Sequence, residues 1–148
     1  RGLTEIAPDV FVAAQIPRLH KQETIPTHFE VKAQGQWEQD TIFEELLLIF
    51  RHDRGLVVLS GCSHRGVINS LEYVQQLFPG ERLYAFVAGM HLNDVSSERL
   101  AWTMDKLAQL DLEWIVPLHC TGLEATCGLM RRFPKQCLTP HVGDEIRF

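Results

Sequence analysis

LVVLSGCSHRGVINS, residues 56 to 70, runs from an apolar segment through a glycine-flanked Cys-Ser-His sequence into a regular apolar pattern. The first four residues form the continuous apolar run that is typical of a buried strand. Glycines on both sides of Cys-Ser-His allow the backbone to turn sharply and to approach a ligand closely. Apolar residues then recur from Val67 with the spacing of a helix. The stretch therefore predicts a strand, a turn that presents His64, and a helix.

The composition of the chain indicates one globular domain. The 148 residues are 45% hydrophobic and 22% charged, and this length accommodates one core but is short for two. The net charge of -5 gives no electrostatic reason to expect nucleic acid or an anionic membrane as a partner. No apolar run approaches the about 20 residues that span a bilayer. Four cysteines without a CxxC pair indicate a reducing, cytoplasmic compartment, with most of them acting as small buried side chains.

The remainder of the chain repeats the pattern of a strand followed by a helix. Strands are expected over residues 9–16, 44–50, 56–60, 83–89 and 114–118, with a short last strand in 145–148. Helices are expected over residues 66–78, 97–110 and 123–133. The strands at 44–50 and 56–60 flank a glycine-containing turn, which predicts a β-hairpin. Continuous apolar strands that alternate with amphipathic helices predict an α/β fold, in which repeated βα units follow the hairpin and helices cover the sheet.

Each of the three strands in the repeat is followed by a histidine. These residues are His64, His91 and His119, separated by 27 and 28 positions. Right-handed crossovers place the carboxyl ends of parallel strands along one edge of a sheet, where ligands of open α/β sheets bind. Neutral imidazole is a good ligand for zinc or iron. A single histidine at such a place is more often a satisfied polar residue than a ligand, but the shared position of all three predicts a metal or catalytic site.

Several neighbours of these histidines have both a functional and a structural interpretation. Cys62 and Cys120 could add thiolate ligands, although packing beneath the loops is the favoured interpretation. Ser63, Arg65 and Thr121 lie near expected helix N-termini, whose free N–H groups and positive dipole end attract anions. For Arg65, a solvated surface charge is an equally good interpretation, and Ser63 could merely shape its turn.

The other histidines are weaker candidates. Residues 17–41 lack a clear period and form a longer connection than most loops of compact domains, so we expect a segment there that is functional, mobile or wrapped over a missing part. His20 and His28 could reach the site from this segment. His52 is expected in the hairpin turn and His141 in a loop.

Three segments carry a resemblance to a known family. They are GCSHRG at 61–66, AGMHL at 88–92 and PLHCTG at 117–122. Together they resemble the second half of the metallo-β-lactamase fold superfamily, in particular the branch typified by dihydropterin ribofuranosylaminobenzene-phosphate synthases. That branch has Gly-Gly where this chain has Ala88-Gly89. DTIFEELLL, at 40–48, resembles the acidic segment that precedes the first motif in that branch. Because Glu44 and Glu45 begin an expected strand, we expect one of them to face inward or to lie at the strand mouth, with a structural role favoured.

The resemblance implies a fold and a set of roles. The fold would be the C-terminal half of an αββα sandwich, with residues 1–148 as a single half-domain and the metal site at its upper edge. His64 and His119 would bind a divalent transition metal, with zinc as the first choice and iron or manganese as alternatives. His91 would act as a third ligand or as a catalytic proton donor. The implied function is hydrolysis of a small substrate, such as a phosphate ester, contacted by the Ser63, Arg65 and Thr121 side chains.

The chain also departs from the family pattern. The His-x-His-x-Asp-His signature, which provides most ligands for two metals, is absent, and the chain begins at Arg1. We therefore expect a truncated domain that is inactive or weakly active alone and that pairs with an N-terminal half or with another copy of itself. Two alternatives stay open, namely a non-catalytic module that binds a metal or an anion, and a structural half of an assembly.

Overall fold

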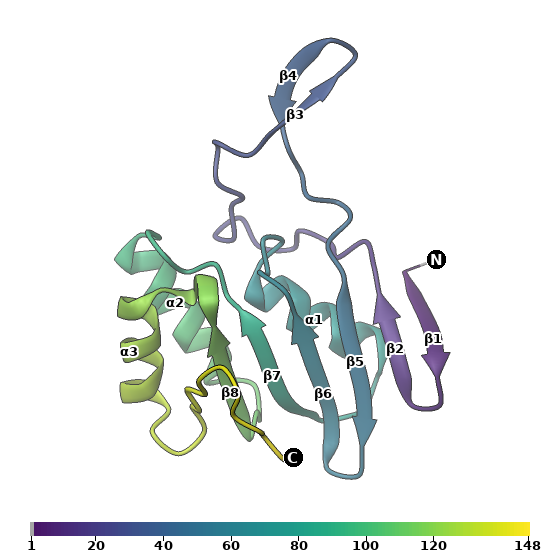
Figure 1. Ribbon diagram of the computed structural model, residues 1–148, viewed down its shortest axis with the longest axis vertical. Helices are drawn as coiled ribbons and strands as arrows, with labels where there is room; N and C mark the ends of the chain where they lie inside the picture. Colours follow the sequence, from purple (N-terminus) through teal and green to yellow (C-terminus); the bar gives the residue numbers. More distant parts are fainter. Residues whose placement is uncertain (1) are drawn as a thin grey trace.

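The computed structural model describes residues 2–148 as a six-stranded sheet with three helices packed on one face and a separate two-stranded hairpin (Figure 1). The six-stranded sheet contains β1 (Leu3–Ala7), β2 (Val10–Ala13), β5 (Leu47–His52), β6 (Gly55–Ser60), β7 (Leu83–Gly89) and β8 (Trp114–Leu118). The hairpin contains β3 (Glu30–Ala33) and β4 (Gln36–Gln39). The helices are α1 (Val67–Leu77), α2 (Ser97–Leu107) and α3 (Leu123–Arg132), with a short 3-10 turn, η1 (His119–Thr121). Within residues 2–148, no helix is long and apolar enough to cross a membrane.

The strand order places three carboxyl ends at one edge of the sheet. The strands lie in the order β1-β2-β5-β6-β7-β8. Neighbours from β1 to β6 are antiparallel, whereas β6, β7 and β8 are parallel to one another. α1 connects β6 to β7, and α2 connects β7 to β8. These two βαβ units bring the residues that follow β6, β7 and β8 to the same edge, as the sequence predicts.

The main core lies between the sheet and the three helices. Side chains alternate along each strand, so that Leu56 and Val58 of β6 point into this core while Val57 points to the opposite face. The helices contribute buried apolar residues at helical spacing, such as Leu71 of α1 and Leu129 of α3, which are both fully buried. Burial of these faces stabilises the fold by about 25 cal/mol for each Å² of apolar surface removed from water.

The second face of the sheet carries no helix and is only partly covered. Its half-buried apolar residues are Val10, Val12, Leu48, Phe50, Leu59, Val87 and Trp114. A smaller cluster around Val57, Tyr84 and Ala85 packs against some of them, and the ring of the C-terminal Phe148 lies 6.2 Å from the ring of Tyr84. The face is therefore apolar across the sheet but incompletely shielded from water.

Two sequence predictions differ from the structure. Residues 145–148 do not form a strand. Instead the chain after α3 pairs beside β8, where Ile115 N–H donates to Gln136 O at 2.9 Å and Leu138 N–H donates to Ile115 O at 3.0 Å. The long connection at 17–41 contains the β3–β4 hairpin, which projects away from the main sheet (Figure 1). Its turn residues Gln34 and Gly35 have φ angles of 50° and 85°, as a tight hairpin turn requires.

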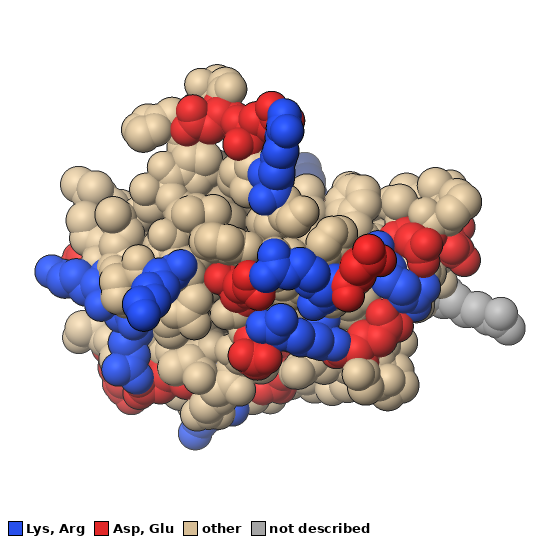
Figure 2. Space-filling model, turned by 90° about the horizontal axis from the view of Figure 1, so that it is seen from below, with Lys and Arg blue, Asp and Glu red and all other residues tan. Residues whose placement is uncertain are grey.

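The end of the sheet opposite the histidines carries charges of both signs. Arg51 contacts Asp9 and Glu81, and Arg54 and Arg82 contact carboxylates that include Asp111 and Glu113. Figure 2 views the molecule from this end and shows the basic and acidic side chains side by side. Exposed pairs of this kind contribute little to stability. Because Arg51, Arg54 and Arg82 each have an acidic neighbour, these three arginines do not form a single-sign patch for a polyanion.

Candidate functional site

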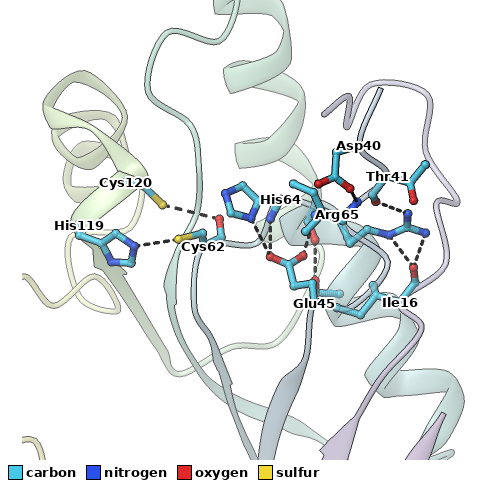
Figure 3. Close-up of polar contacts among 12 residues, drawn as sticks. Ile16, Asp40, Thr41, Glu45, Cys62, His64, Arg65, His119 and Cys120 are labelled. Atoms are coloured by element: carbon cyan, nitrogen blue, oxygen red, sulfur yellow. Dashed lines mark hydrogen bonds and ion pairs between the residues drawn. The ribbon is translucent and has the colours of Figure 1, made fainter. Parts of the chain in front are cut away.

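The three strand-end histidines fall into two groups. The rings of His64 and His91 lie 4.7 Å apart between centroids, in an edge-to-face arrangement. His119, by contrast, has its Nε2 atom 3.1 Å from the Sγ atom of Cys62 (Figure 3). Within residues 2–148, the one group of three or more potential ligands whose ligating atoms all lie within 4.8 Å of one another is Cys62, His119 and Cys120.

The turn after β6 has a backbone that only certain residues can adopt. Gly66, the residue before α1, has φ of 110°, which disfavours any side chain. A Cβ atom at this position would also overlap the carboxylate of Glu23. That carboxylate is buried and accepts the N–H groups of Ile68 and Asn69 at 2.9 and 2.7 Å, which satisfies two donors at the start of α1. Burial raises the pKa of Glu23, and these two hydrogen bonds oppose that rise.

Glu45, at the entrance to β5, holds the same turn from the other side (Figure 3). Oε1 accepts the backbone N–H of His64 and Oε2 accepts that of Arg65, both at 2.7 Å. Oε1 also lies 3.4 Å from Nδ1 of His64. The carboxylate thus fixes the backbone that carries His64 and restricts the orientation of its ring. Of the two glutamates that the sequence singled out, Glu45 is the one that points inward.

The Cys62, His119 and Cys120 group depends on close packing beneath it. Gly89 ends β7 directly beside this group, and a Cβ atom there would lie 2.6 Å from Cε1 of His119 and 2.7 Å from Sγ of Cys120. Sγ of Cys120 makes a long contact of 3.7 Å to the carbonyl oxygen of Cys62. Burial raises the pKa of the Cys120 thiol to about 11. Thiolate sulfur and imidazole nitrogen are the donors that zinc and related ions prefer, so this donor set fits a transition metal.

Like His64 and unlike the exposed His119, His91 is half-buried. Its backbone φ is 43°, and its ring also lies 5.7 Å from the ring of Phe29. Burial lowers the pKa of His91, and the neighbouring His64 lowers it further. A histidine with a lowered pKa is neutral at physiological pH, so its ring can bind a metal or accept a proton. Phe29 also contacts His64, at 5.3 Å between ring centroids, and covers both imidazoles.

An open groove of about 920 Å³ begins at His91. It runs between residues 21–28 and the start of α2, and its wall includes Lys21, Arg99 and Trp102. Arg99 donates from Nη1 to Thr24 O at 2.9 Å, while its Nε atom is buried without a partner. The groove therefore offers cationic donors and an indole ring within a single wall. No sequence motif singled out these residues, because they come from an irregular loop and from an otherwise ordinary helix face.

The three side chains expected to contact an anion have different surroundings. Arg65 is buried, and its guanidinium donates to the carbonyl oxygens of Ile16, at 2.9 and 2.7 Å, and Thr41, at 2.8 Å. Its burial shows that the interpretation as a solvated surface charge was wrong, and its donors are engaged by loops that cover α1, so the anion contact of Arg65 stays a prediction. Thr121 is buried as well, and its Oγ1 accepts the N–H of Met90 at 3.2 Å. The hydroxyl of Ser63 is buried without a partner.

The remaining histidines are distributed over the molecule. His20 lies 2.8 Å from a carboxylate oxygen of Glu72 and beside Trp102, and His28 lines the groove next to His91. His52 ends β5 and stacks on Tyr84, with 5.6 Å between ring centroids. His141 is an exposed loop residue. Of the weaker candidates, His28 alone shares the groove with His91.

Comparison with known proteins finds curated relatives and a similar solved structure. No family model matches the chain. It is 30% identical over 151 residues to the 7,8-dihydropterin-6-methyl-4-(β-D-ribofuranosyl)-aminobenzene-5'-phosphate synthase of Methanocaldococcus jannaschii, covering 100% of this chain and 51% of the relative. An uncharacterized protein of the same organism is 31% identical over 142 residues, covering 96% of this chain and 51% of that protein. The chain thus spans about half the length of the curated relatives it matches.

A solved structure is similar over the whole chain. It is a crystal structure described as a metal-dependent hydrolase of the β-lactamase superfamily, with a TM-score of 0.92 and 30% sequence identity. The similarity covers 100% of this chain and 57% of that structure. The part that the two share includes the strands and helices that bring the histidines and cysteines to one edge.

Proposed function

Because this chain belongs to the metallo-β-lactamase fold superfamily, we propose that it contributes metal ligands and substrate contacts to a metal-dependent hydrolase of a small, phosphorylated substrate. The observation that carries this proposal is the convergence of three histidines and two cysteines at the ends of β6, β7 and β8. Ligands of open α/β sheets bind at such an edge. The similarity to a metal-dependent hydrolase supports the reaction class, and the phosphate in the synthase relative's name supports the substrate class.

His64 and His119 are the metal ligands in this proposal, and the cofactor is a divalent transition metal, with zinc preferred over iron or manganese. When bound, such a metal lowers the pKa of a coordinated water and polarises the bond under attack. Glu45 keeps His64 in place through the two backbone hydrogen bonds at 2.7 Å, as outer partners of metal ligands do. His91, held neutral beside His64, serves as a further ligand or takes and returns a proton.

The groove beside His91 is the proposed substrate site. Arg99 and Lys21 would meet the anionic group, and the indole of Trp102 would pack against an apolar or aromatic part of the substrate. Arg99 supports this assignment because it lines the groove while its hydrogen bonds to Thr24 use only Nη1, which leaves other guanidinium donors for an anion. Ser63 and Thr121 are the two hydroxyl residues that the sequence predicts to contact an anion. Only the hydroxyl of Ser63 lacks a partner, so Ser63 remains a candidate contact.

The uncovered face of the sheet supports a partner. Half-buried residues such as Phe50, Leu59 and Trp114 form a broad apolar surface without a helix over it. Large exposed apolar patches on soluble proteins mark interaction sites. Since the curated relatives are about twice as long, we propose that polypeptide equivalent to their other half covers this face. Sedimentation at micromolar concentration tests the proposal: a stable, compact monomer of the chain alone would contradict it, and a homodimer would assign the face to a second copy.

A non-catalytic module that binds a metal is the second candidate. The chain lacks the His-x-His-x-Asp-His signature, so its own ligands cannot complete a two-metal site. We accordingly expect little or no turnover of bis(p-nitrophenyl) phosphate by the chain alone. Robust turnover would overturn that expectation and favour a self-sufficient enzyme. Binding of a phosphate ester in the groove separates a hydrolase part from a metal module, because a metal module has no need of a substrate site.

Phenyl phosphate, which combines an aromatic ring with a phosphate, is the probe for this test. We expect it to perturb the indole NMR signal of Trp102 in the zinc-loaded chain, and we expect Arg99→Gln to weaken binding about tenfold, or about 1.4 kcal/mol. Arg132→Gln, which alters an exposed arginine of α3, is the matched control. Equal binding by Arg99→Gln and the wild type would contradict the proposed substrate site.

A further inference from the structure

Two thiols meet the imidazole of His119, one of the two proposed metal ligands, at the surface. Cys62 follows β6, whereas His119 and Cys120 follow β8, so two separate crossovers bring these residues together. The Sγ atom of Cys62 lies 3.1 Å from Nε2 of His119. All three ligating atoms lie within 4.8 Å of one another, as the left side of Figure 3 shows for their side chains. Sequence reasoning favoured plain packing for both cysteines, and this convergence argues against it.

We propose that Cys62, His119 and Cys120 form a binding site for one thiophilic cation, such as Zn²⁺ or Cd²⁺, that does not require His64. Two thiolates and an imidazole are a donor set that selects soft and borderline metals. Three protein ligands leave the fourth position of a tetrahedral ion open, so water or an exogenous ligand would complete the coordination. His119 is also one of the two metal ligands in the proposed hydrolase site. The inference rests on the proposed function only through this shared residue.

The surroundings of the thiols are those of a ligand site rather than of core packing. His119 is exposed and both cysteines are half-buried, so an ion in solution can reach the three ligating atoms. The thiol of Cys120 has only a long contact of 3.7 Å to a backbone carbonyl, and Cys62 has the imidazole as its polar neighbour. By contrast, Cys137 packs against the main apolar core, and Cys127 lies exposed on α3.

Gly89, at the end of β7, also supports a ligand site at Cys62, His119 and Cys120. Its N–H donates to the carbonyl oxygen of Gly61 at 2.9 Å, which joins the end of β7 to the turn that carries Cys62. Because Gly89 has no side chain, His119 and Cys120 can lie against the backbone at this point. The end of β7 therefore forms the floor of the three-ligand group. All four cysteines are free, as a thiolate site requires and as suits the reducing, cytoplasmic location that we propose.

The test is Co²⁺ binding by the reduced chain, read by absorption. Thiolate ligation gives a sulfur-to-cobalt charge-transfer band in the near ultraviolet, which imidazole and carboxylate ligands do not give. We expect the band in the wild type, in Cys127→Ser and in His64→Ala. Cys62→Ser and Cys120→Ser each keep one thiol, so we expect a weaker band and a loss of Cd²⁺ affinity larger than the about 10–100-fold that loss of an outer partner costs. The Cys62→Ser/Cys120→Ser double variant should lose the band. Circular dichroism shows whether each variant is folded.

A second measurement needs no variant. Cd²⁺ should slow alkylation of Cys62 and Cys120 in the wild-type chain, as read by peptide mass spectrometry, while the rate at Cys127 stays unchanged. Absence of the charge-transfer band in the reduced wild type, an unchanged band in the Cys62→Ser/Cys120→Ser double variant, or equal alkylation rates with and without Cd²⁺ would each overturn the proposal. A lower amount of bound Co²⁺ in His64→Ala, with the band retained at its wild-type intensity, would support this site and would separately support His64 as a ligand of a second ion.

Discussion

Glu45 Oε1 accepts the backbone N–H of His64 at 2.7 Å, and it does so from the loop that leads into β5, one hairpin before the histidine. The second carboxylate oxygen accepts the next N–H along the chain, that of Arg65, at the same distance. A single side chain at the entrance to β5 thus fixes the backbone at the end of β6. The geometry of the candidate metal ligand is therefore set by an acidic residue that is not itself grouped with the ligands.

Glu45→Ala should destabilise the chain and weaken metal binding together. Hydrogen bonds to a charged group contribute about 1.5–3 kcal/mol, and the Glu45 side chain is only 7% exposed, so we expect a loss in that range. Urea unfolding measures the change in free energy. Glu44→Ala, which alters the exposed neighbour, is the control and should change stability little. Equal stability of the two variants would contradict the role of Glu45.

Arg65→Met should be destabilising without a direct effect on substrate binding. The methionine keeps the apolar stem but removes the donors to Ile16 O and Thr41 O, and each carbonyl left without a donor costs about 1–3 kcal/mol. Arg131→Met, at an exposed position of α3, is the matched control. Unfolding in urea gives the stability, and phenyl phosphate binding by the folded variant gives the second readout. A variant that is as stable as the wild type but fails to bind phenyl phosphate would contradict this prediction and support Arg65 as an anion contact.

Gly89→Ala should disturb the Cys62, His119 and Cys120 group from beneath. An added Cβ would lie 2.5 Å from Gly61 O and 2.6 Å from Cε1 of His119, so backbone or ligand must shift. Overpacking of this kind costs about 1–3 kcal/mol. We expect a lower thermal midpoint and weaker Cd²⁺ binding. The control is Gly61→Ala, because a Cβ atom at Gly61 would meet open space. Gly80→Ala is unsuitable as a control, since φ of 86° at Gly80 would add backbone strain. Unchanged Cd²⁺ affinity in Gly89→Ala would contradict the packing argument.

Tyr73→Phe should lower stability at neutral pH but not at high pH. The hydroxyl donates to Ala14 O at 3.0 Å, and loss of one such bond costs about 0.5–1.5 kcal/mol. Burial raises the pKa of Tyr73, so the stabilisation is fully present below the pKa of the unfolded chain, about 10, and is lost as the pH rises through the folded pKa. Urea unfolding of both proteins from pH 7 to 11 should show the difference shrinking. A difference that stays constant would contradict this account.

The fold was predictable where the hydrophobic pattern was strong. β7 and β8 match the expected ranges, and all three helices were expected within a few residues of their observed bounds. The superfamily resemblance and the layered α/β fold are also confirmed. The β3–β4 hairpin was missed because its strands are exposed and carry no apolar alternation. The strand expected at 145–148 was wrong, since Phe148 packs through its ring rather than through a backbone ladder.

The site was predictable in position but not in grouping. The strand-end rule placed His64, His91 and His119 at one edge, where the structure has them. Which side chains meet there depends on turn conformations, such as φ of 54° at Ser63 and 43° at His91, that no hydrophobic pattern encodes. Contacts with distant loops likewise decide whether a charged side chain is available, as with the engagement of Arg65 by residues far along the chain.

The most direct test of the central claim is equilibrium dialysis of the chain against Zn²⁺, followed by elemental analysis. The comparison is between the wild type, His64→Ala and His141→Ala, the last altering an exposed loop histidine. Repeating it in a Cys62→Ser/Cys120→Ser background isolates the histidine ligands from the thiols. We predict that His64→Ala binds less zinc than the wild type in both backgrounds, with unchanged circular dichroism, and that His141→Ala matches the wild type. Equal zinc binding by His64→Ala and the wild type in both backgrounds would contradict the assignment of this edge as a metal centre built on His64.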